Sequence, residues 1–451
     1  MEAVRLDRIA VWCKGDVVDK DITKKYCYGI STDSRQIKKG DLFIALKGDR
    51  FDGTEFTNSA LKNGAIAAIV PKTFQSNSKR LIKVKDTLKA LGDIANGYRN
   101  TFDVYVIGIT GSDGKTTTKE FIKKTLSTRY NVSGTEGNFN NAIGLPLSIF
   151  TIDKKTDFCI LEMGMNRENE IRYLGKIAGP QAGIITTVGP AHIGFFKNIH
   201  QIAEAKSELI ETLKGEKFCM FNYDNKFFSF FREKAPAKVL SFGMKKGADI
   251  RGNIVREEND FFTFQVDGKR TLYKINFWNT SIIYPALIAI GLGKKFGITE
   301  KEIENALEDI KPLPGRGKIY HLKGITVIDE SYNCNPNSLK ASLYNLHKKS
   351  YKRKIAIIGD MAELGKLSYT YHRNIGLFIK KINLDIIITF GEKSREIGKL
   401  SGIQWKHSED MDILNRHLSS LIEKGDAILI KGSRIMNMER IRKYLLEKYG
   451  G

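Results

Sequence analysis

The stretch with the clearest chemistry is GSDGKTT (residues 111–117), between a strand-like run, VYVIGIT (104–110), and a helix-like run, KEFIKKTLSTRY (119–130). Its glycines allow backbone N–H groups to surround phosphate oxygens, Lys115 supplies a positive charge, and the Thr116 hydroxyl can ligate Mg²⁺. The pattern therefore predicts ATP binding, although Ile109 stands where the longer form of the motif has glycine. The predicted nucleotide contacts in this loop are Gly111, Ser112, Gly114, Lys115, Thr116 and Thr117.

Other residues could surround the phosphates. Glu162 closes the strand-like run CILEMG and would give Mg²⁺ a carboxylate beside Thr116 if the two strands are neighbours; the alternative is a solvated turn. His192, in GPAHIGFF, follows another strand-like run, where a lone histidine is more often structural than a metal ligand. Lys206, in AEAKSELIE, has glutamates nearby, which favours a surface ion pair. Asp113 is an acid inside the phosphate loop, and we expect it to point toward solvent.

Two amide-rich segments are candidates for ligand contact. TEGNFNNAIGLP (residues 135–146) is typical of a structured turn and equally of a polar binding loop. DESYNCNPNS (329–338) follows a strand-like run, so its acid could bind a ribose hydroxyl, and its polar residues could cap a helix. Cys334 has no assignable base and is interpreted as a small packing residue. The candidates in these segments are Asn138, Asn140, Asn141, Asp329, Tyr332, Asn333 and Asn335.

The chain as a whole has the size of a multidomain enzyme. Its 451 residues exceed one compact core, and its five scattered cysteines, without metal spacing, are typical of free thiols in the cytoplasm. We expect neither a signal peptide nor a membrane span, because charges interrupt every apolar run. The net charge of +22 is spread along the chain, which favours solvated lysine-rich faces over a nucleic-acid surface.

Strand-like and helix-like runs alternate, which predicts an α/β protein of three domains. We expect a small α/β domain over residues 1–100, a central parallel sheet with the phosphate loop over 101–313, and a Rossmann-like doubly wound sheet over 314–451. KPLPGRGK (311–318) is the predicted linker and hinge between the last two domains.

Taken together, the motifs resemble the Mur ligase family, the ATP-dependent amide-forming enzymes of cell-wall precursor synthesis in bacteria. The resemblance covers nearly the whole chain and includes TDSRQIKKGDLFIALKGDRFDG, TGSDGKTTTKE, EGNFNNAIGLP, LEMGMNRENEI, AHIGFF, AKSE, LPGRGK, DESYNCNPNS, GDMAELG and KGSR. DESYNCNPNS followed by GDMAELG is similar to the members that add D-alanyl-D-alanine to UDP-N-acetylmuramoyl-tripeptide. The characteristic motif of members that add diaminopimelate as third residue is not found.

The resemblance also implies roles for individual residues. It assigns Lys115 to the ATP phosphates, Thr116 and Glu162 to one Mg²⁺, and His192 to a second Mg²⁺, which a carbamoylated Lys206 would help to hold. The remaining matches are Ser34 and Arg35 for uridine diphosphate, Asn138, Asn140 and Asn141 for the muramoyl peptide, Arg316 and Asp329 for the nucleotide, and Tyr332, Asn333 and Asn335 for substrate. One departure concerns adenine: Ser281, Ile282 and Pro285 stand where the family has histidine and two asparagines, and Asn279 is a possible substitute.

Two other functions remain open at this point. A sibling ligase that adds the third amino acid would share every ATP-site residue, and a P-loop ATPase that binds nucleic acid would explain the phosphate loop and the charge of +22. The second alternative leaves TDSR and GNFNN without a role. We expect a monomer, without nucleic acid as a partner, and the sequence leaves lysine and diaminopimelate open as the tripeptide's third residue.

Overall fold

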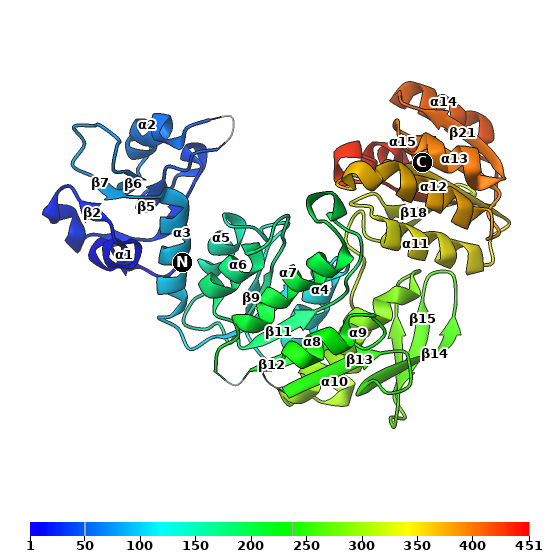
Figure 1. Ribbon diagram of the computed structural model, residues 1–451, viewed down its shortest axis with the longest axis horizontal. Coiled ribbons are helices and arrows are strands. Elements are labelled where there is room, and N and C mark those ends of the chain that lie inside the picture. The colour runs from blue at the N-terminus through cyan, green and yellow to red at the C-terminus, as the bar shows by residue number, and fades with distance from the viewer. Residues whose placement is uncertain (49–50, 216, 237, 451) are drawn as a thin grey trace.

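The computed structural model describes residues 1–48, 51–215, 217–236 and 238–450. It consists of three lobes in a row, each built on one large sheet flanked by helices (Figure 1). We call them the N-terminal, central and C-terminal lobes. The arrangement confirms the predicted α/β class, with three large sheets and a two-stranded sheet, β1-β3, among the described residues. The predicted domain boundaries at residues 100 and 313 stay predictions.

The N-terminal lobe holds a five-stranded sheet in the order β2-β7-β6-β5-β4, in which only the β2–β7 pair is antiparallel. The predicted strands in GDLFIAL and AIAAIVP are present as β5 and β6. The elements are β1 (Val4–Arg5), α1 (Leu6–Cys13), β2 (Asp16–Val17), β3 (Tyr26–Cys27), β4 (Gly29–Ser31), β5 (Asp41–Ile44), α2 (Thr57–Lys62), β6 (Ala67–Pro71), β7 (Leu81–Val84) and α3 (Thr87–Arg99).

The central lobe holds a nine-stranded sheet in the order β16-β15-β14-β13-β12-β11-β8-β10-β9. In this spatial order, all strands from β14 to β9, including β8, run parallel to one another. Their apolar runs are buried because helices cover both faces. Its strands are β8 (Tyr105–Thr110), β9 (Val132–Gly134), β10 (Phe158–Glu162), β11 (Ala182–Ile185), β12 (Phe218–Asn222), β13 (Lys238–Gly243), β14 (Ile250–Glu257), β15 (Phe262–Val266) and β16 (Leu272–Ile275). Its helices are α4 (Lys115–Leu126), α5 (Gly144–Ile149), α6 (Glu170–Ala178), α7 (Ile199–Glu211), α8 (Phe228–Lys234), α9 (Ile283–Lys295) and α10 (Glu300–Glu308).

One edge of the central sheet was not anticipated from the sequence. Strands β14, β15 and β16 extend the parallel sheet by two antiparallel pairs, and the turn between β14 and β15 reaches toward the C-terminal lobe. Figure 1 shows β14 and β15 rising from the central lobe below α11 (Pro336–Lys348). This extension provides a second contact between the two lobes, away from the phosphate loop.

The C-terminal lobe holds a six-stranded sheet in the order β17-β18-β22-β19-β20-β21, parallel except for the β17–β18 pair. The four predicted β-branched runs form β18, β22, β19 and β20, each followed by a helix, as a doubly wound sheet requires. The elements are β17 (Lys318–Leu322), β18 (Ile325–Glu330), α11, β19 (Arg353–Gly359), α12 (Ser368–Ile379), β20 (Ile386–Phe390), α13 (Arg395–Ser401), β21 (Gln404–Ser408), α14 (Met411–Leu421), β22 (Asp426–Lys431) and α15 (Glu439–Tyr449).

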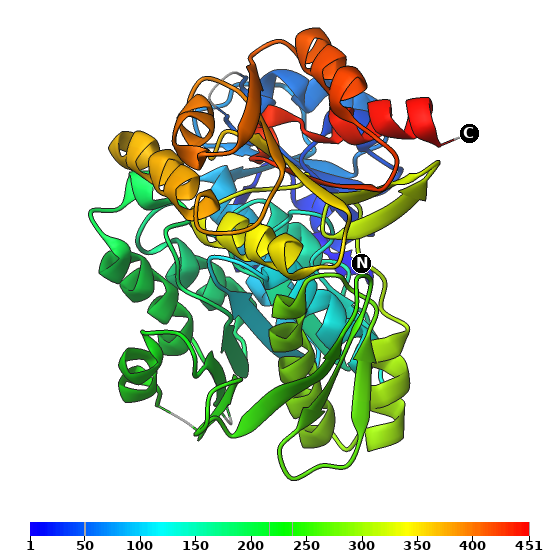
Figure 2. The same cartoon turned by 90° about the vertical axis from the view of Figure 1, so that its right-hand side faces the viewer.

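The lobes are placed so that the carboxyl ends of the central and C-terminal strands face each other. Turned by 90°, the molecule shows the C-terminal lobe above the central lobe, with α11 between them (Figure 2). Residues 309–317 form the irregular segment between the two lobes, as predicted for KPLPGRGK. Among the helices described, none has both the length and the apolar character to cross a membrane.

Candidate active site

The phosphate loop has the conformation that its sequence predicts. Strand β8 ends at Thr110 and α4 begins at Lys115, so the four residues between them form a tight turn at a helix N-terminus. Gly114 has φ +81°, and a Cβ on Gly111 would lie 1.9 Å from Oγ1 of Thr186. Both positions therefore require glycine. The N-terminus of α4 leaves backbone N–H groups free for an anion.

The segment after β11 holds this loop in place. The Ser112 N–H donates to the Thr187 carbonyl at 2.9 Å, and the Ser112 hydroxyl donates to the Gly189 carbonyl at 3.0 Å. The Asp113 N–H donates to Thr187 Oγ1 at 3.1 Å. The loop is thus fixed to the neighbouring strand before any ligand binds.

Lys115 folds back over the loop and carries a charge that is poorly solvated. Its Nζ donates to the Gly111 carbonyl at 2.7 Å. Burial lowers the pKa of Lys115 below its usual value, and the carboxylates of Glu162 and Asp113 oppose that shift. A bound phosphate would supply the counter-charge that the ammonium lacks.

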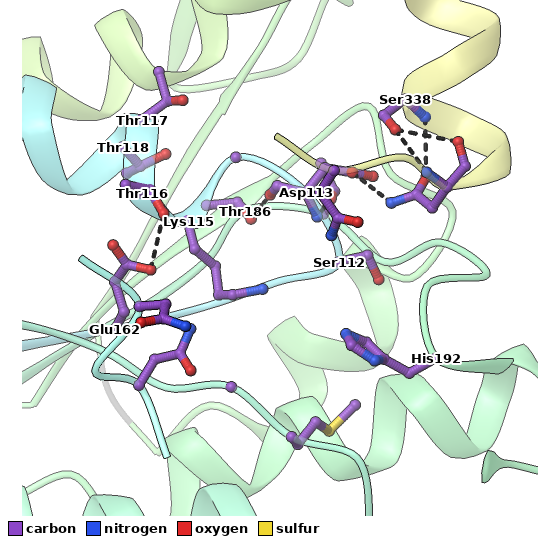
Figure 3. A pocket seen from close by; sticks show the side chains of 18 of the residues that line it. Ser112, Asp113, Lys115, Thr116, Thr117, Thr118, Glu162, Thr186, His192 and Ser338 are labelled. Atoms are coloured by element: carbon purple, nitrogen blue, oxygen red, sulfur yellow. Dashed lines mark hydrogen bonds between the residues drawn. The ribbon is translucent and has the colours of Figure 1, made fainter. Parts of the chain in front are cut away.

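Glu162 and Thr116 form a site suited to a hard cation. Strands β8 and β10 are parallel neighbours, with Glu162 opposite Ile109, so the condition set by the sequence is met. The Thr116 hydroxyl donates to Glu162 Oε2 at 3.1 Å, and Glu162 is 1% exposed (Figure 3). None of the described residues donates a hydrogen bond to Glu162 Oε1, and Lys119 Nζ lies 3.6 Å from it. An underused buried carboxylate oxygen beside a hydroxyl fits Mg²⁺, which binds through one or two carboxylates together with phosphates and water.

His192 connects the central lobe to the C-terminal lobe. It has φ +63°, and its Nδ1 lies 2.7 Å from Oε2 of Glu363 in the GDMAELG segment. The contact with His192 is the main reason why the pKa of Glu363 is lowered. Because Nδ1 faces this carboxylate, Nε2 is the nitrogen that can bind a metal. Among the described residues, no three His, Cys, Asp or Glu side chains are grouped as a ready-made metal site.

Lys206 is buried, so the surface ion pair suggested by its neighbouring glutamates is wrong. It is 2% exposed on α7 and forms no ion pair within the described residues. Burial, and next the charge of Lys115, lower the pKa of Lys206 well below its usual value. Burial therefore favours the neutral form of this amine, which lies close to the phosphate loop.

A cavity of about 1280 Å³ connects these elements with the C-terminal lobe. It brings together most of the predicted site residues, from segments that are far apart in sequence. The predicted residues that line it are Ser112, Gly114, Lys115, Thr116, Thr117, Asn138, Asn140, Asn141, Glu162, His192, Asn279, Arg316, Tyr332, Asn333 and Asn335. Five predicted residues do not line it, namely Ser34, Arg35, Gly111, Lys206 and Asp329.

Two of these five lie in the N-terminal lobe. Ser34 and Arg35 form a short turn after β4, and the Arg35 guanidinium binds Asp33 through two hydrogen bonds of 2.9 and 2.7 Å. These bonds lower the pKa of Asp33 to about 2. Figure 1 shows this lobe set apart from the C-terminal lobe, so only a long ligand could contact both the turn and the cavity.

Asp329 differs most from its expected position. It is fully buried, and its carboxylate accepts hydrogen bonds from the Gly315 N–H at 2.9 Å, from Ser331, and from Arg442 Nη1 at 2.9 Å. These bonds tie the linker and the last helix, α15, to the end of β18. The structure therefore places Asp329 as an anchor of the linker, and not at the surface of the cavity.

The structure also uses two asparagines differently from a simple ligand contact. Asn279 is buried, and its Oδ1 accepts from the Ser281 N–H at 3.0 Å and from Asn345 Nδ2 at 3.1 Å. Asn141 Oδ1 accepts from the N–H of Gly144, the first residue of α5, at 2.8 Å. Both line the cavity while their side chains are engaged with the protein.

Asp113 does not point toward solvent, and this expectation is wrong. Its Oδ1 accepts a hydrogen bond of 2.6 Å from Nδ2 of Asn335, which lies in the C-terminal lobe (Figure 3). The two residues are 222 positions apart. No local pattern in the sequence signals such a contact.

The C-terminal wall of the cavity contains the predicted Arg316 together with charged residues that were not predicted as site residues, Glu330, Lys431 and Arg434. Arg316 stacks on the Tyr332 ring at 3.9 Å, and Arg434 lies 5.8 Å from the same ring. Lys431 and Glu330 form a buried ion pair of 2.7 Å; burial lowers the pKa of Lys431, but the Glu330 carboxylate outweighs burial and raises it. Lys431 and Arg434 belong to the KGSR segment at the end of β22, which is one of the motifs that carry the resemblance.

A phosphate loop that faces a second doubly wound sheet across a deep cavity defines a nucleotide-dependent enzyme of several lobes. The sequence matches the Mur ligase family, catalytic domain, over residues 27–99, the Mur ligase middle domain over 109–293, and the Mur ligase, glutamate ligase domain over 315–434. The UDP-N-acetylmuramoyl-tripeptide--D-alanyl-D-alanine ligase of Bacillus subtilis (strain 168) is 32% identical over 97% of both chains.

Solved structures agree with this assignment. A crystal structure of MurF from Acinetobacter baumannii is 27% identical and superposes with a TM-score of 0.92 over 99% of both chains. The MurF ligase from Thermotoga maritima in complex with ADP is 29% identical, with a TM-score of 0.84, over 93% of this chain and 97% of that one. The chain therefore belongs to the Mur ligase family. Mur ligases use ATP and Mg²⁺, in agreement with the phosphate loop and with the fit of Glu162 and Thr116 to a cation.

Proposed function

We propose that this enzyme joins D-alanyl-D-alanine to UDP-N-acetylmuramoyl-tripeptide in an ATP-dependent reaction that forms an amide bond. The observation that carries the proposal is the convergence of the phosphate loop, the GNFNN loop and DESYNCNPNS on one cavity. It is supported by the 32% identity, over 97% of both chains, to the Bacillus subtilis ligase that bears this activity in its name. The reaction would belong to bacterial cell-wall precursor synthesis in the cytoplasm, and we propose a monomer.

The chemistry follows from the poor reactivity of a carboxylate toward an amine. ATP would transfer its terminal phosphoryl group to the tripeptide carboxylate, ADP would leave, and the amine of D-alanyl-D-alanine would displace phosphate from the resulting acyl phosphate. The loop N–H groups would hold the phosphates, and Lys115 Nζ would turn from the Gly111 carbonyl to the transferring group. No protein nucleophile is required, which agrees with the interpretation of Cys334 as a packing residue.

Mg²⁺, when bound, would neutralise the charge that develops on the transferring phosphoryl group. We propose that Thr116 and Glu162 hold one ion, and that Nε2 of His192 and a carbamoylated Lys206 hold a second. The burial of Lys206 supports its modification, because a neutral amine is the form that reacts with carbon dioxide. The carbamate would turn a buried, unpaired side chain into an anion beside Lys115.

The three lobes suggest a division of labour. We propose domain boundaries at residues 100 and 313, with uridine diphosphate bound near Ser34 and Arg35 and the peptide end of the same substrate at Asn138, Asn140 and Asn141. Arg316, Tyr332 and Asn333 would contact the nucleotide and the incoming dipeptide from the C-terminal lobe.

The proposal is tested by phosphate release with ATP and Mg²⁺ in three parallel reactions. These contain UDP-N-acetylmuramoyl-tripeptide with D-alanyl-D-alanine, UDP-N-acetylmuramoyl-dipeptide with lysine or diaminopimelate, and nucleic acid alone. We expect release with the first pair only. Release with the second pair would identify a sibling ligase, and stimulation by nucleic acid alone would reject the ligase function.

The proposed carbamate has its own test. Lys206→Ala should lose activity, and short carboxylic acids such as acetate should restore part of it by occupying the place of the carbamate. Mass spectrometry of the wild type in bicarbonate should detect an added carbon dioxide that is absent from Lys206→Ala. Full activity of the variant without any acid would contradict this role.

A further inference from the structure

Helix α11 spans the junction between the two lobes that form the cavity. Its 13 residues correspond to about 20 Å, and both of its ends bind the central lobe. At the N-terminal end the contact is with the phosphate loop. At the C-terminal end it is with the segment before α9 and with the β14–β15 turn.

The N-terminal contact is one short hydrogen bond between two fixed groups. Asn335 caps α11, because its Oδ1 accepts from the N–H groups of Asn337 at 3.1 Å and Ser338 at 3.0 Å. Its Nδ2 is therefore directed away from the helix, and it donates to Asp113 Oδ1 at 2.6 Å (Figure 3). The backbone of Asp113 is held by its N–H bond to Thr187 Oγ1. The helix cap therefore orients the donor, and the fixed loop positions the acceptor.

The C-terminal contact is broader and more deeply buried. Asn345 Oδ1 accepts from Thr280 through its N–H at 3.2 Å and its hydroxyl at 3.0 Å. Lys349, just after the helix, is 4% exposed, and its Nζ lies 3.1 Å from Oε1 of Glu257 and also binds the Glu258 carbonyl. Breaking a buried charge pair is more costly than breaking one hydrogen bond at a cavity rim. The C-terminal end is thus the firm attachment, and the Asp113 end is the contact that can open.

We propose that Asp113 and Asn335 form a latch that holds the C-terminal lobe over the phosphate loop, with Asp113 as a positioning residue for the reaction. The bond connects the phosphate loop directly to the N-terminal end of α11, which begins within DESYNCNPNS. While the bond is formed, the C-terminal lobe is held in one position relative to the phosphate loop. The test of the latch by enzyme activity rests on the proposed function, whereas the test by lobe arrangement does not.

The pair can be tested by exchanging its two side chains. Asn335→Asp keeps a good helix cap, since aspartate and asparagine cap helices equally well, but it places two carboxylates together. Asp113→Asn with Asn335→Asp restores the bond, because the amide at position 113 can donate to the carboxylate at position 335. Asp113→Ala removes the acceptor from the other side and serves if Asn335→Asp fails to fold.

The lobe arrangement is measured directly by energy transfer between dyes on cysteines introduced at Lys197 and Lys380, both exposed and in different lobes. The five native cysteines are buried and do not compete for label. We expect Asn335→Asp and Asp113→Ala to move the distance distribution to longer values and to lower kcat by about tenfold or more, the scale of a lost hydrogen bond to a charged group. The affinity for ADP should change by a smaller factor than kcat.

The exchange variant should restore both the distances and kcat to within a few-fold of the wild type. An unchanged distance distribution in Asn335→Asp and Asp113→Ala would overturn the latch. So would a loss in Asn335→Asp that the exchange does not repair, because Asn335 would then act on something other than Asp113. If the wild type is inactive with every substrate pair, the proposed function is rejected. The distances between the two dyes would still test the latch in that case.

Discussion

Replacing Lys115 by methionine should affect activity and stability in opposite directions. The Lys115 ammonium makes one hydrogen bond, of 2.7 Å, to the Gly111 carbonyl, and burial lowers its pKa. An apolar side chain of similar length removes a poorly solvated charge, so the free energy of unfolding should stay the same or rise by up to about 1 kcal/mol. The attraction between the ammonium and one phosphate charge at about 4 Å is roughly 4 kcal/mol at an effective dielectric constant of about 20, or about a thousandfold in rate.

The assay combines kcat and KM from phosphate release with thermal unfolding in the presence and absence of ADP. Lys123→Met, an exposed position on the same helix, is the matched control and should behave as wild type in both measurements. A Lys115→Met enzyme that keeps more than a tenth of wild-type kcat/KM would refute the phosphate role. A variant that loses activity only in proportion to a large drop in stability would show that Lys115 is structural.

Four further predictions concern other contacts. Glu162→Gln keeps the size of the side chain but removes its charge, so half-maximal phosphate release should need about tenfold more Mg²⁺; an unchanged requirement would exclude Glu162 as a ligand. Burial raises the pKa of Cys334 to about 12, so the native enzyme should resist thiol reagents at pH 8 and stay active, and the contribution of this burial to stability should fall as pH rises above 9. In Gly194→Ala the new Cβ would lie 2.6 Å from the Gly365 nitrogen across the lobe contact, so kcat should fall while calorimetry still detects ADP binding. Asp329→Asn leaves Arg442 without its carboxylate, which should lower the unfolding free energy by about 3 kcal/mol; a raised KM for ATP at unchanged stability would instead indicate a ribose contact.

Local patterns were sufficient for the elements that carry the phosphate chemistry. Residues 104–110 are mostly apolar, without the alternation of polar and apolar residues of a half-exposed strand, and a glycine follows them. This pattern predicts a buried strand, and β8 occupies Tyr105–Thr110. The position of Glu162 beside Thr116 followed from two such strands being neighbours in a parallel sheet. Each of these inferences depends on residues that are close in sequence or paired by a common topology.

The sequence failed where a residue's role depends on a distant partner. The glutamates around Lys206 have helical spacing, which indicates a surface, but Lys206 is buried, and α7 packs on strands β8 and β11 of the central sheet. Asp113 meets Asn335 only because two sheets built from different parts of the chain face each other. The β14–β16 extension contains ordinary alternating strands, yet nothing local shows that it adds to the central sheet or contacts the C-terminal lobe.

The linker illustrates how such distant contacts change a functional argument. Its prolines and glycines predict a hinge over residues 311–318, but the second half of this segment is bound to the C-terminal lobe. The Gly315 N–H donates to Asp329, the Tyr332 N–H donates to the Gly315 carbonyl at 3.1 Å, and the Gly317 N–H donates to the Asp329 carbonyl at 2.7 Å. Residues from 315 onward therefore move with that lobe. Because α10 ends at Glu308, rotation about the linker is confined to residues 309–314. The buried attachment of Lys349 to Glu257 restrains the same motion from the other end of the lobe contact, so opening of the latch at Asp113 requires that α11 turns about that attachment.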